Sequence, residues 1–145
     1  MMDHGALTDA LIAYMDAQTD LLIGDGLAPL DGGWLLGQPN NSVFRPYAVL
    51  VSGGAMMRDT PMNSFDPNWS VSWSLRSFGG SRKQVDWAAH KARLSIESFV
   101  GTTFGTPVFK VYSLEWKNLG AVTRIDSTDP PFWQVFDTFN FVCSK

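Results

Sequence analysis

The residues most suggestive of chemistry are Gly79-Gly80-Ser81-Arg82-Lys83, because they lie between a strand-like run and a predicted helix. Glycines before a helix N-terminus form the phosphate-binding loops of many nucleotide enzymes. A Walker-type loop requires GxxxxGK followed by Ser or Thr, and neither that spacing nor the dinucleotide pattern GxGxxG is present here. Ser81 instead fits a helix N-cap, and Gln84 three residues later completes a capping box. We therefore interpret this segment as a structural turn.

The other residue types that carry catalysis form no recognisable constellation. His4 is expected in a frayed terminus, and His90 is expected to be solvated on the polar side of a helix. The single cysteine, Cys143, can make neither an internal disulfide nor a cysteine-based zinc site. Asp126 and Asp129 lie in IDSTDPPF, which has the composition of an ordinary turn. The sequence thus predicts no catalytic residue, no metal site and no cofactor. A hydrolase that uses His90 is one alternative, and it would need an acidic partner folded beside the histidine.

Length and composition favour one soluble domain. The chain has 145 residues, of which 45% are hydrophobic, and a formal net charge of −3. Because no long basic block is present, sequence-independent binding to DNA phosphates is not expected. The N-terminal residues are acidic and lack a long apolar run, so we expect no signal peptide, no membrane anchor and synthesis in a cytoplasm. Six Trp and ten Phe leave aromatic side chains for interfaces after the core is filled.

Hydrophobic periodicity predicts two helices and four strands. Apolar residues recur at helical spacing over Ala6–Leu22, where Gly24 and Gly26 follow as terminators, and over Ser81–Val100. Strand patterns occupy Tyr47–Ser52, Trp69–Phe78, Phe109–Leu119 and Phe132–Val142, and the residues Arg124–Pro131 read as a loop. The order α-β-β-α-β-β predicts an α+β fold with a mainly antiparallel sheet and helices packed on one face.

The faces of these elements can also be predicted. In the second helix the buried stripe is expected to be Val85, Ala88, Ala89, Ala92, Ile96 and Phe99. Trp87 and Leu94 point to the opposite side, which favours a partner there or cover by another part of the chain. One strand is expected to be half-buried, with Trp69, Val71, Trp73 and Leu75 on one face. In another, Tyr112, Leu114 and Trp116 are expected on one face and Val111, Ser113, Glu115 and Lys117 on the other.

Two long loops remain. The connector Asp25–Arg45 contains Trp34-Leu35-Leu36, which favours a short strand. The second loop, Gly53–Asn68, is rich in methionine and contains Pro61 and Pro67. Loops this long in a compact domain are usually functional or disordered. Methionine side chains pack adaptably on partners, and the alternative is a loop folded over its own core.

Three segments carry a family resemblance. They are AP-x-x-GGW-x-x-GQPN-x-S-x-F-x-PY-x-VL at Ala28–Leu50, SFGGSRKQVDWAAHKAR at Ser77–Arg93 and DPPFWQVFDTF at Asp129–Phe139. Together they resemble the tail terminator proteins of long-tailed (siphovirus) phages of actinobacteria, over about Leu7 to Val142. The methionine-rich loop departs from that family.

The resemblance implies a virion protein that works by binding and performs no reaction. It implies a ring, usually a hexamer, that caps the tail tube, ends tube polymerisation and presents a surface to the head-tail connector or stopper protein. Its partners would be further copies of itself, the tail tube protein, the connector protein and the tape-measure protein. Genomic DNA would pass through the lumen without specific binding. The ring would lie at the tail-neck junction after assembly in the host cytoplasm.

Specific residues are expected at these contacts. A ring requires two different patches on each subunit, and Trp87, Leu94 and Trp34 are candidates for one of them. The candidate docking residues for tube or neck are Met56, Met57, Arg58, Asp59, Met62 and Phe65. Two further alternatives are another neck or tail-completion protein of similar fold, and a small-ligand-binding α+β domain with an aromatic-lined pocket between sheet and helix.

Overall fold

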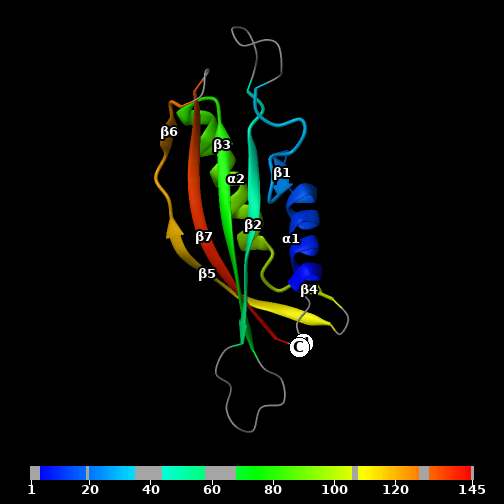
Figure 1. The fold of residues 1–145 in the computed structure, drawn as a ribbon. Coiled ribbons are helices and arrows are strands. Elements are labelled where there is room, and N and C mark those ends of the chain that lie inside the picture. The colour runs from blue at the N-terminus through cyan, green and yellow to red at the C-terminus, as the bar shows by residue number, and fades with distance from the viewer. Residues whose placement is uncertain are drawn as a thin grey trace.

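Two helices and one curled sheet make up the fold (Figure 1). The computed structural model describes residues 4–18, 20–34, 44–57, 68–105, 108–127 and 131–144. The elements in chain order are α1 (His4–Gln18), β1 (Leu22–Asp25), β2 (Tyr47–Met57), β3 (Trp69–Gly79), α2 (Arg82–Ser98), β4 (Thr103–Phe104), β5 (Phe109–Leu119), β6 (Thr123–Ile125) and β7 (Phe132–Ser144). The predicted α+β class is confirmed, whereas the predicted six-element order lacks the short strands β1, β4 and β6.

The sheet has the strand order β1-β2-β3-β7-β5-β4, and β6 also pairs with β7. Every pairing is antiparallel except that of β1 with β2, which is parallel. The prediction of a mainly antiparallel sheet is therefore confirmed. β3 and β7 pair without a break from Trp69↔Cys143 to Gly79↔Trp133 and form the centre of the sheet.

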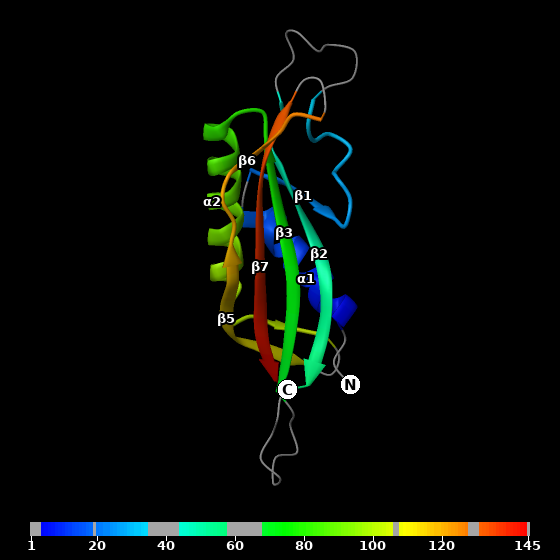
Figure 2. The same cartoon turned by 60° about the vertical axis from the view of Figure 1, so that its left-hand side comes forward.

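Both helices pack on the same face of this sheet (Figure 2). The side chains of Leu7, Leu11 and Met15 from α1 join the core-facing residues of β3 and four residues of the predicted α2 stripe in one buried cluster. The four are Ala88, Ala92, Ile96 and Phe99, whereas Val85 and Ala89 pack with Val135 of β7 in a second, smaller cluster. Trp73 lies at the centre of the larger cluster, with its ring stacked on Phe139 at a centroid distance of 5.6 Å. Burial alternates along β3 as predicted from the sequence. Apolar burial on this face is the main stabilising term of the fold.

The start of the chain differs from the sequence-based prediction. The first helix ends at Gln18 rather than Leu22, and Leu22 begins β1 by pairing with Tyr47. The prediction that Gly24 terminates the helix is wrong, because Gly24 lies within β1. A Cβ atom at Gly24 would collide with the backbone carbonyl of Leu27, so glycine is needed for close approach. The local pattern could not reveal a pairing with a strand more than 20 residues away.

The second strand is longer than predicted. β2 continues through Gly53 to Met57, which the sequence analysis assigned to a loop, and pairs with β3 as far as Met57↔Trp69. A bulge between Ser52 and Gly54 absorbs the glycines, and Gly54 has a φ of +95°. Pairing with β3 therefore overrides the turn signal of two adjacent glycines.

Two bulges in β5 change which of its side chains face the core. The register with β7 shifts between Val111 and Ser113 and again between Trp116 and Asn118. Val111 is buried, whereas Tyr112 is 52% exposed. Because a bulge inserts one residue, Leu114 and Trp116 lie on the core side with Val111, so the prediction that Tyr112 shares their face is wrong.

Candidate functional site

The start of α2 is a capped helix end. The Oγ atom of Ser81 accepts a hydrogen bond from the Gln84 amide at 3.2 Å, which confirms the predicted N-cap. The side chain of Gln84 accepts from the Gly80 amide at 2.7 Å rather than from Ser81, and it donates to the Phe44 carbonyl at 2.8 Å. These internal bonds occupy groups that a phosphate would need, and they tie the connector before β2 to the helix.

Neither histidine contacts an acidic side chain in the part of the chain that the structure describes. His4 is not frayed as predicted: it begins α1, stacks on Trp73 at 5.7 Å and contacts the Ser52 hydroxyl at 3.1 Å. His90 is exposed on α2, one turn after Asp86. In the described part of the chain, no hydrogen bond or ion pair joins His90 to Asp86 or to another residue. This arrangement lacks the oriented acid that activates a catalytic histidine.

Metal ligands and reactive thiols give no site either. Across the described ranges, no group of three or more His, Cys, Asp or Glu side chains is placed to hold a metal ion. Cys143 is fully buried, and burial raises the pKa of its thiol to about 12. A thiol with such a pKa stays protonated and unreactive at neutral pH. No helix in the described segments has the length and apolar character needed to cross a membrane.

A buried ion pair joins the helix layer to the sheet. Arg93 of α2 donates from Nε to Oδ2 of Asp137 at 2.8 Å and from Nη2 to Oδ1 at 2.7 Å. The amide of Gly120 donates to the same Oδ1 at 2.8 Å. Asp137 is fully buried, and its hydrogen bond is the main cause that raises the pKa of Arg93. Because three donors occupy this carboxylate, it serves as a structural anchor rather than as a general base. The sequence analysis missed it, since Asp137 and Arg93 are 44 residues apart.

The solvent side of α2 carries the two predicted apolar residues. Trp87 is 38% exposed and Leu94 is 48% exposed. They are seven positions apart, which corresponds to about two helical turns, so both lie on one side of α2. The predicted orientation of these two side chains, away from the buried stripe, is therefore confirmed.

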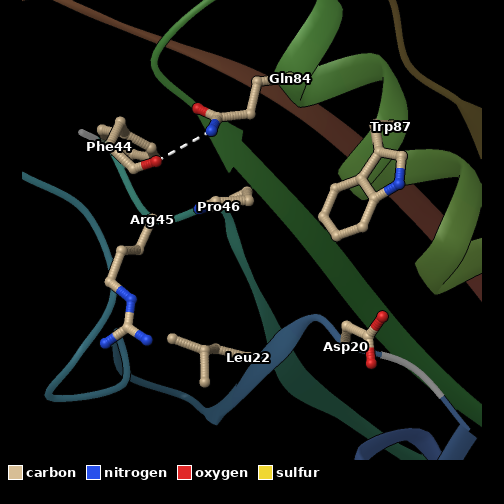
Figure 3. A pocket seen from close by; sticks show the side chains of 7 residues that line it. All are labelled: Asp20, Leu22, Phe44, Arg45, Pro46, Gln84 and Trp87. Carbon is tan, nitrogen blue, oxygen red and sulfur yellow. Dashed lines mark hydrogen bonds between the residues drawn. The ribbon is translucent and has the colours of Figure 1, made fainter.

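Trp87 also forms one wall of an open hollow of about 280 Å³. Figure 3 shows the indole facing the hollow, with Pro46 and the Asp20 carboxylate on its other sides. The remaining lining residues are Leu22, Phe44, Arg45 and Gln84. Phe44 and Arg45, the last two residues of the connector, thus line the hollow beside Trp87. This hollow is open to the surface, and it lies between α2, which contributes Gln84 and Trp87, and β1, which contributes Leu22.

Trp34 lies in the connector, next to one of the residues that line this hollow. Its ring packs edge-to-face on Phe44 at 5.2 Å, and the side chain is half-buried. The Phe44 ring in turn stacks on Tyr47 with a centroid distance of 6.1 Å, and Tyr47 stacks on Phe78 with a centroid distance of 4.7 Å. Trp34 therefore joins an aromatic series that leads onto the sheet. The predicted strand at Trp34-Leu35-Leu36 is not seen at Trp34, whose neighbour Gly33 forms an isolated bridge with Arg45, and Leu35 and Leu36 lie outside the described residues.

The predicted docking residues divide into two groups. Met56 and Met57 lie in β2, so their assignment to a loop is wrong. Arg58, Asp59, Met62 and Phe65 lie outside the described residues. Because Met57 pairs with Trp69, the segment that contains these four residues joins β2 to β3 at the end of the sheet that is farthest from the start of α2.

No protein-family model matches the sequence, and no curated protein matches it. The functional assignment therefore rests on the three motifs quoted above and on the exposed features of this fold.

Proposed function

We propose that this protein is a phage tail terminator, a structural virion protein without enzymatic activity. In this proposal its copies form a homo-hexameric ring that caps the tail tube, stops the addition of tube subunits and joins the tube to the head-tail connector. The ring lies at the tail-neck junction, and DNA passes through its lumen. The assignment follows from the resemblance of the motifs at Ala28–Leu50, Ser77–Arg93 and Asp129–Phe139.

The structural observation that most supports an assembly role is the exposure of Trp87 and Leu94 on one side of α2. Single exposed apolar residues are common, but a tryptophan and a leucine two turns apart form a surface that gains stability when a partner covers it. Tryptophan is also among the residues that contribute most to binding at interfaces. The hollow next to Trp87 can accept a side chain of a neighbouring subunit.

The dimensions of the chain fit a ring with a DNA-sized lumen. A domain of 145 residues has a radius of gyration of roughly 14–15 Å. Six bodies of this size in a closed ring surround an opening about one subunit wide, which admits a DNA duplex. The β2–β3 hairpin pairs as far as Met57↔Trp69, and the candidate docking residues Arg58, Asp59, Met62 and Phe65 fall in the sequence between these two strands.

The decisive experiment mixes the purified full chain with the tail tube protein of the same phage. Electron microscopy is expected to show rings of the protein alone, and tubes that stop growing when a ring occupies one end. Tubes that elongate at the same rate with and without the protein would contradict tube capping.

A different class of function predicts a different result. A ligand-binding domain would stay monomeric at high concentration and would melt at a higher temperature with its ligand. Rings that form but bind only the connector would instead identify another neck or tail-completion protein.

A further inference from the structure

We infer that neighbouring subunits in the ring join edge to edge: β2 of one copy pairs antiparallel with β5 of the next copy. One continuous sheet would then run around the ring. This inference rests on the proposed ring and names the contact that closes it. It goes beyond the expected contact at Trp87 and Leu94, because main-chain groups make the pairing.

The outer edge of β2 is open over its second half. β1 pairs only with Tyr47–Leu50, and the Gly26 amide donates to the Leu50 carbonyl at 2.9 Å where this cover ends. From Val51 to Met57, β3 is the only strand in the described residues that pairs with β2. Ser52, Gly53 and Gly54 are exposed. A neighbouring strand can reach this edge.

The direction of the free groups on β2 follows from the register. The amide and carbonyl of one strand residue point to the same side, and successive residues alternate. Since the Leu50 carbonyl points toward β1, Ser52 also points outward, and the bulge at Gly53 shifts the later outward positions to Ala55 and Met57. These three residues present their main-chain donors and acceptors to solvent or to a partner.

The β2 edge also lacks the features that prevent unwanted pairing. Proteins protect edge strands with charges, prolines or short length. Val51–Met57 contains no charged residue and no proline. By contrast, β1 has four residues and β4 has two, which makes both poor templates for a partner strand. An uncharged open edge of this length is expected to be covered in the working state of the protein.

The opposite side of the sheet offers a matching edge on β5. β4 pairs only with Phe109 and Lys110, and residues 101–102 bond only to Val111. From Tyr112 to Leu119, β7 is the only pairing partner within the described part of the chain. By the same alternation, Leu114, Trp116 and Leu119 point their amides outward.

The charges and bulges of β5 are compatible with this pairing. In the open stretch Tyr112–Leu119 the two charged side chains, Glu115 and Lys117, bond to each other at 3.0 Å. Each charge therefore keeps its partner when an uncharged strand pairs with this edge. The bulges lie at either end of a regular stretch, Ser113–Trp116, which can pair with a similar length of β2.

Strand direction favours this arrangement as well. β2, β3, β7 and β5 alternate in direction, so β5 runs opposite to β2. Rotation about a ring axis keeps the direction of each strand along that axis, and β5 of the next copy therefore meets β2 antiparallel. Figure 1 shows β5 and β2 on opposite sides of the sheet, as a head-to-tail contact requires.

Hydrogen–deuterium exchange at single-amide resolution tests this pairing on the full chain. The amides of Ser52, Ala55 and Met57, and those of Leu114, Trp116 and Leu119, should exchange at least about tenfold more slowly in rings than in protein diluted to single copies. Val51 and Glu115 point toward strands of the same copy, so their amides are internal controls.

A matched pair of variants separates the main chain from the side chain. Ser52→Pro removes one outward amide and leaves the ladder to β3 intact, so it should abolish rings while the protein stays folded. Ser52→Ala keeps the amide and should form rings as the natural protein does. If Ser52→Pro does not fold, the exchange measurement on the natural protein decides alone.

The outcomes distinguish the two proposals. Rings whose β2 and β5 edge amides exchange rapidly would overturn the edge pairing but not the proposed ring. Protection of β2 alone, with a twofold dimer, would overturn it in favour of β2–β2 pairing. Protein that remains a single copy at high concentration would overturn both the pairing and the proposed function.

Discussion

At the residue scale, the best-defined interaction is the contact of Arg93 with the buried carboxylate of Asp137. A buried charge that loses its partner is costly, and removal of one member of such a pair typically costs 3–5 kcal/mol. The Arg93 side chain is 28% exposed, so water can still solvate part of its charge. This single contact connects α2, β7 and the turn before β6.

Asp137→Asn is therefore expected to lower the free energy of unfolding by about 2–4 kcal/mol, because it removes the negative charge and one acceptor of the bidentate bond. Urea unfolding at neutral pH measures the change. Glu115→Gln is the matched control, since it breaks an exposed ion pair and should cost less than about 1 kcal/mol. Equal effects of both substitutions would contradict the anchoring role of Asp137.

The buried thiol of Cys143 should make the free energy of unfolding depend on pH. Burial raises the pKa of its thiol from 9.0 to about 12. Between these values the unfolded chain releases the thiol proton and the native chain keeps it, so stability is fully present below pH 9 and falls as the pH rises toward 12. Cys143→Val should show a shallower loss of stability over that window in urea titrations. Rapid reaction of the native thiol with Ellman's reagent at pH 8 would contradict its burial.

At the scale of elements, α2 exposes two apolar side chains, Trp87 and Leu94, to solvent. Trp87→Glu should yield folded protein that does not form rings, because a carboxylate would be desolvated at the subunit contact. His90→Glu is the matched control, since it places the same charge at another exposed position of α2. Sedimentation velocity distinguishes rings from single copies. Rings that persist in Trp87→Glu would show that Trp87 lies outside the subunit contact.

The β2–β3 hairpin is the second element with an expected partner. Its strands pair to Met57↔Trp69, so replacement of residues 58–67 by a short turn leaves the described sheet unchanged. Rings are expected to form normally, whereas their binding to tube or neck should weaken. Phage carrying this replacement should yield few complete virions by electron microscopy. Normal numbers of full-length infectious particles would argue against a docking role for this segment.

At the scale of the whole molecule, charge bears on how a ring treats DNA. Each chain has a formal charge of −3, so six copies carry −18 (six times −3). Such a ring should not bind DNA by counterion release, which requires clustered Lys and Arg. In fluorescence anisotropy at about 0.15 M salt, a labelled duplex should show no binding to assembled rings. Binding that weakens steeply with added salt would reveal a basic lumen and contradict this prediction.

The sequence alone determined the features that depend on neighbours along the chain. Helical and strand periodicity located α2, β3 and the core-facing residues of both, and local hydrogen bonding identified Ser81 as a cap. These signals succeed because their partners lie within a few residues. The expectation of a ring came from the resemblance of three motifs and not from hydrophobic periodicity. The ring is therefore a proposal.

The tertiary structure decided the features that depend on distant partners. β1 exists because Leu22–Asp25 meets β2, and Gly53–Met57 is a strand because β3 lies beside it. The bulge beside Tyr112 reversed its orientation, and the fold brought Arg93 to Asp137 across 44 residues. The open edges of β2 and β5 likewise emerge only from the strand order. Pairing between strands is a long-range interaction, so no local pattern of residue types can specify it.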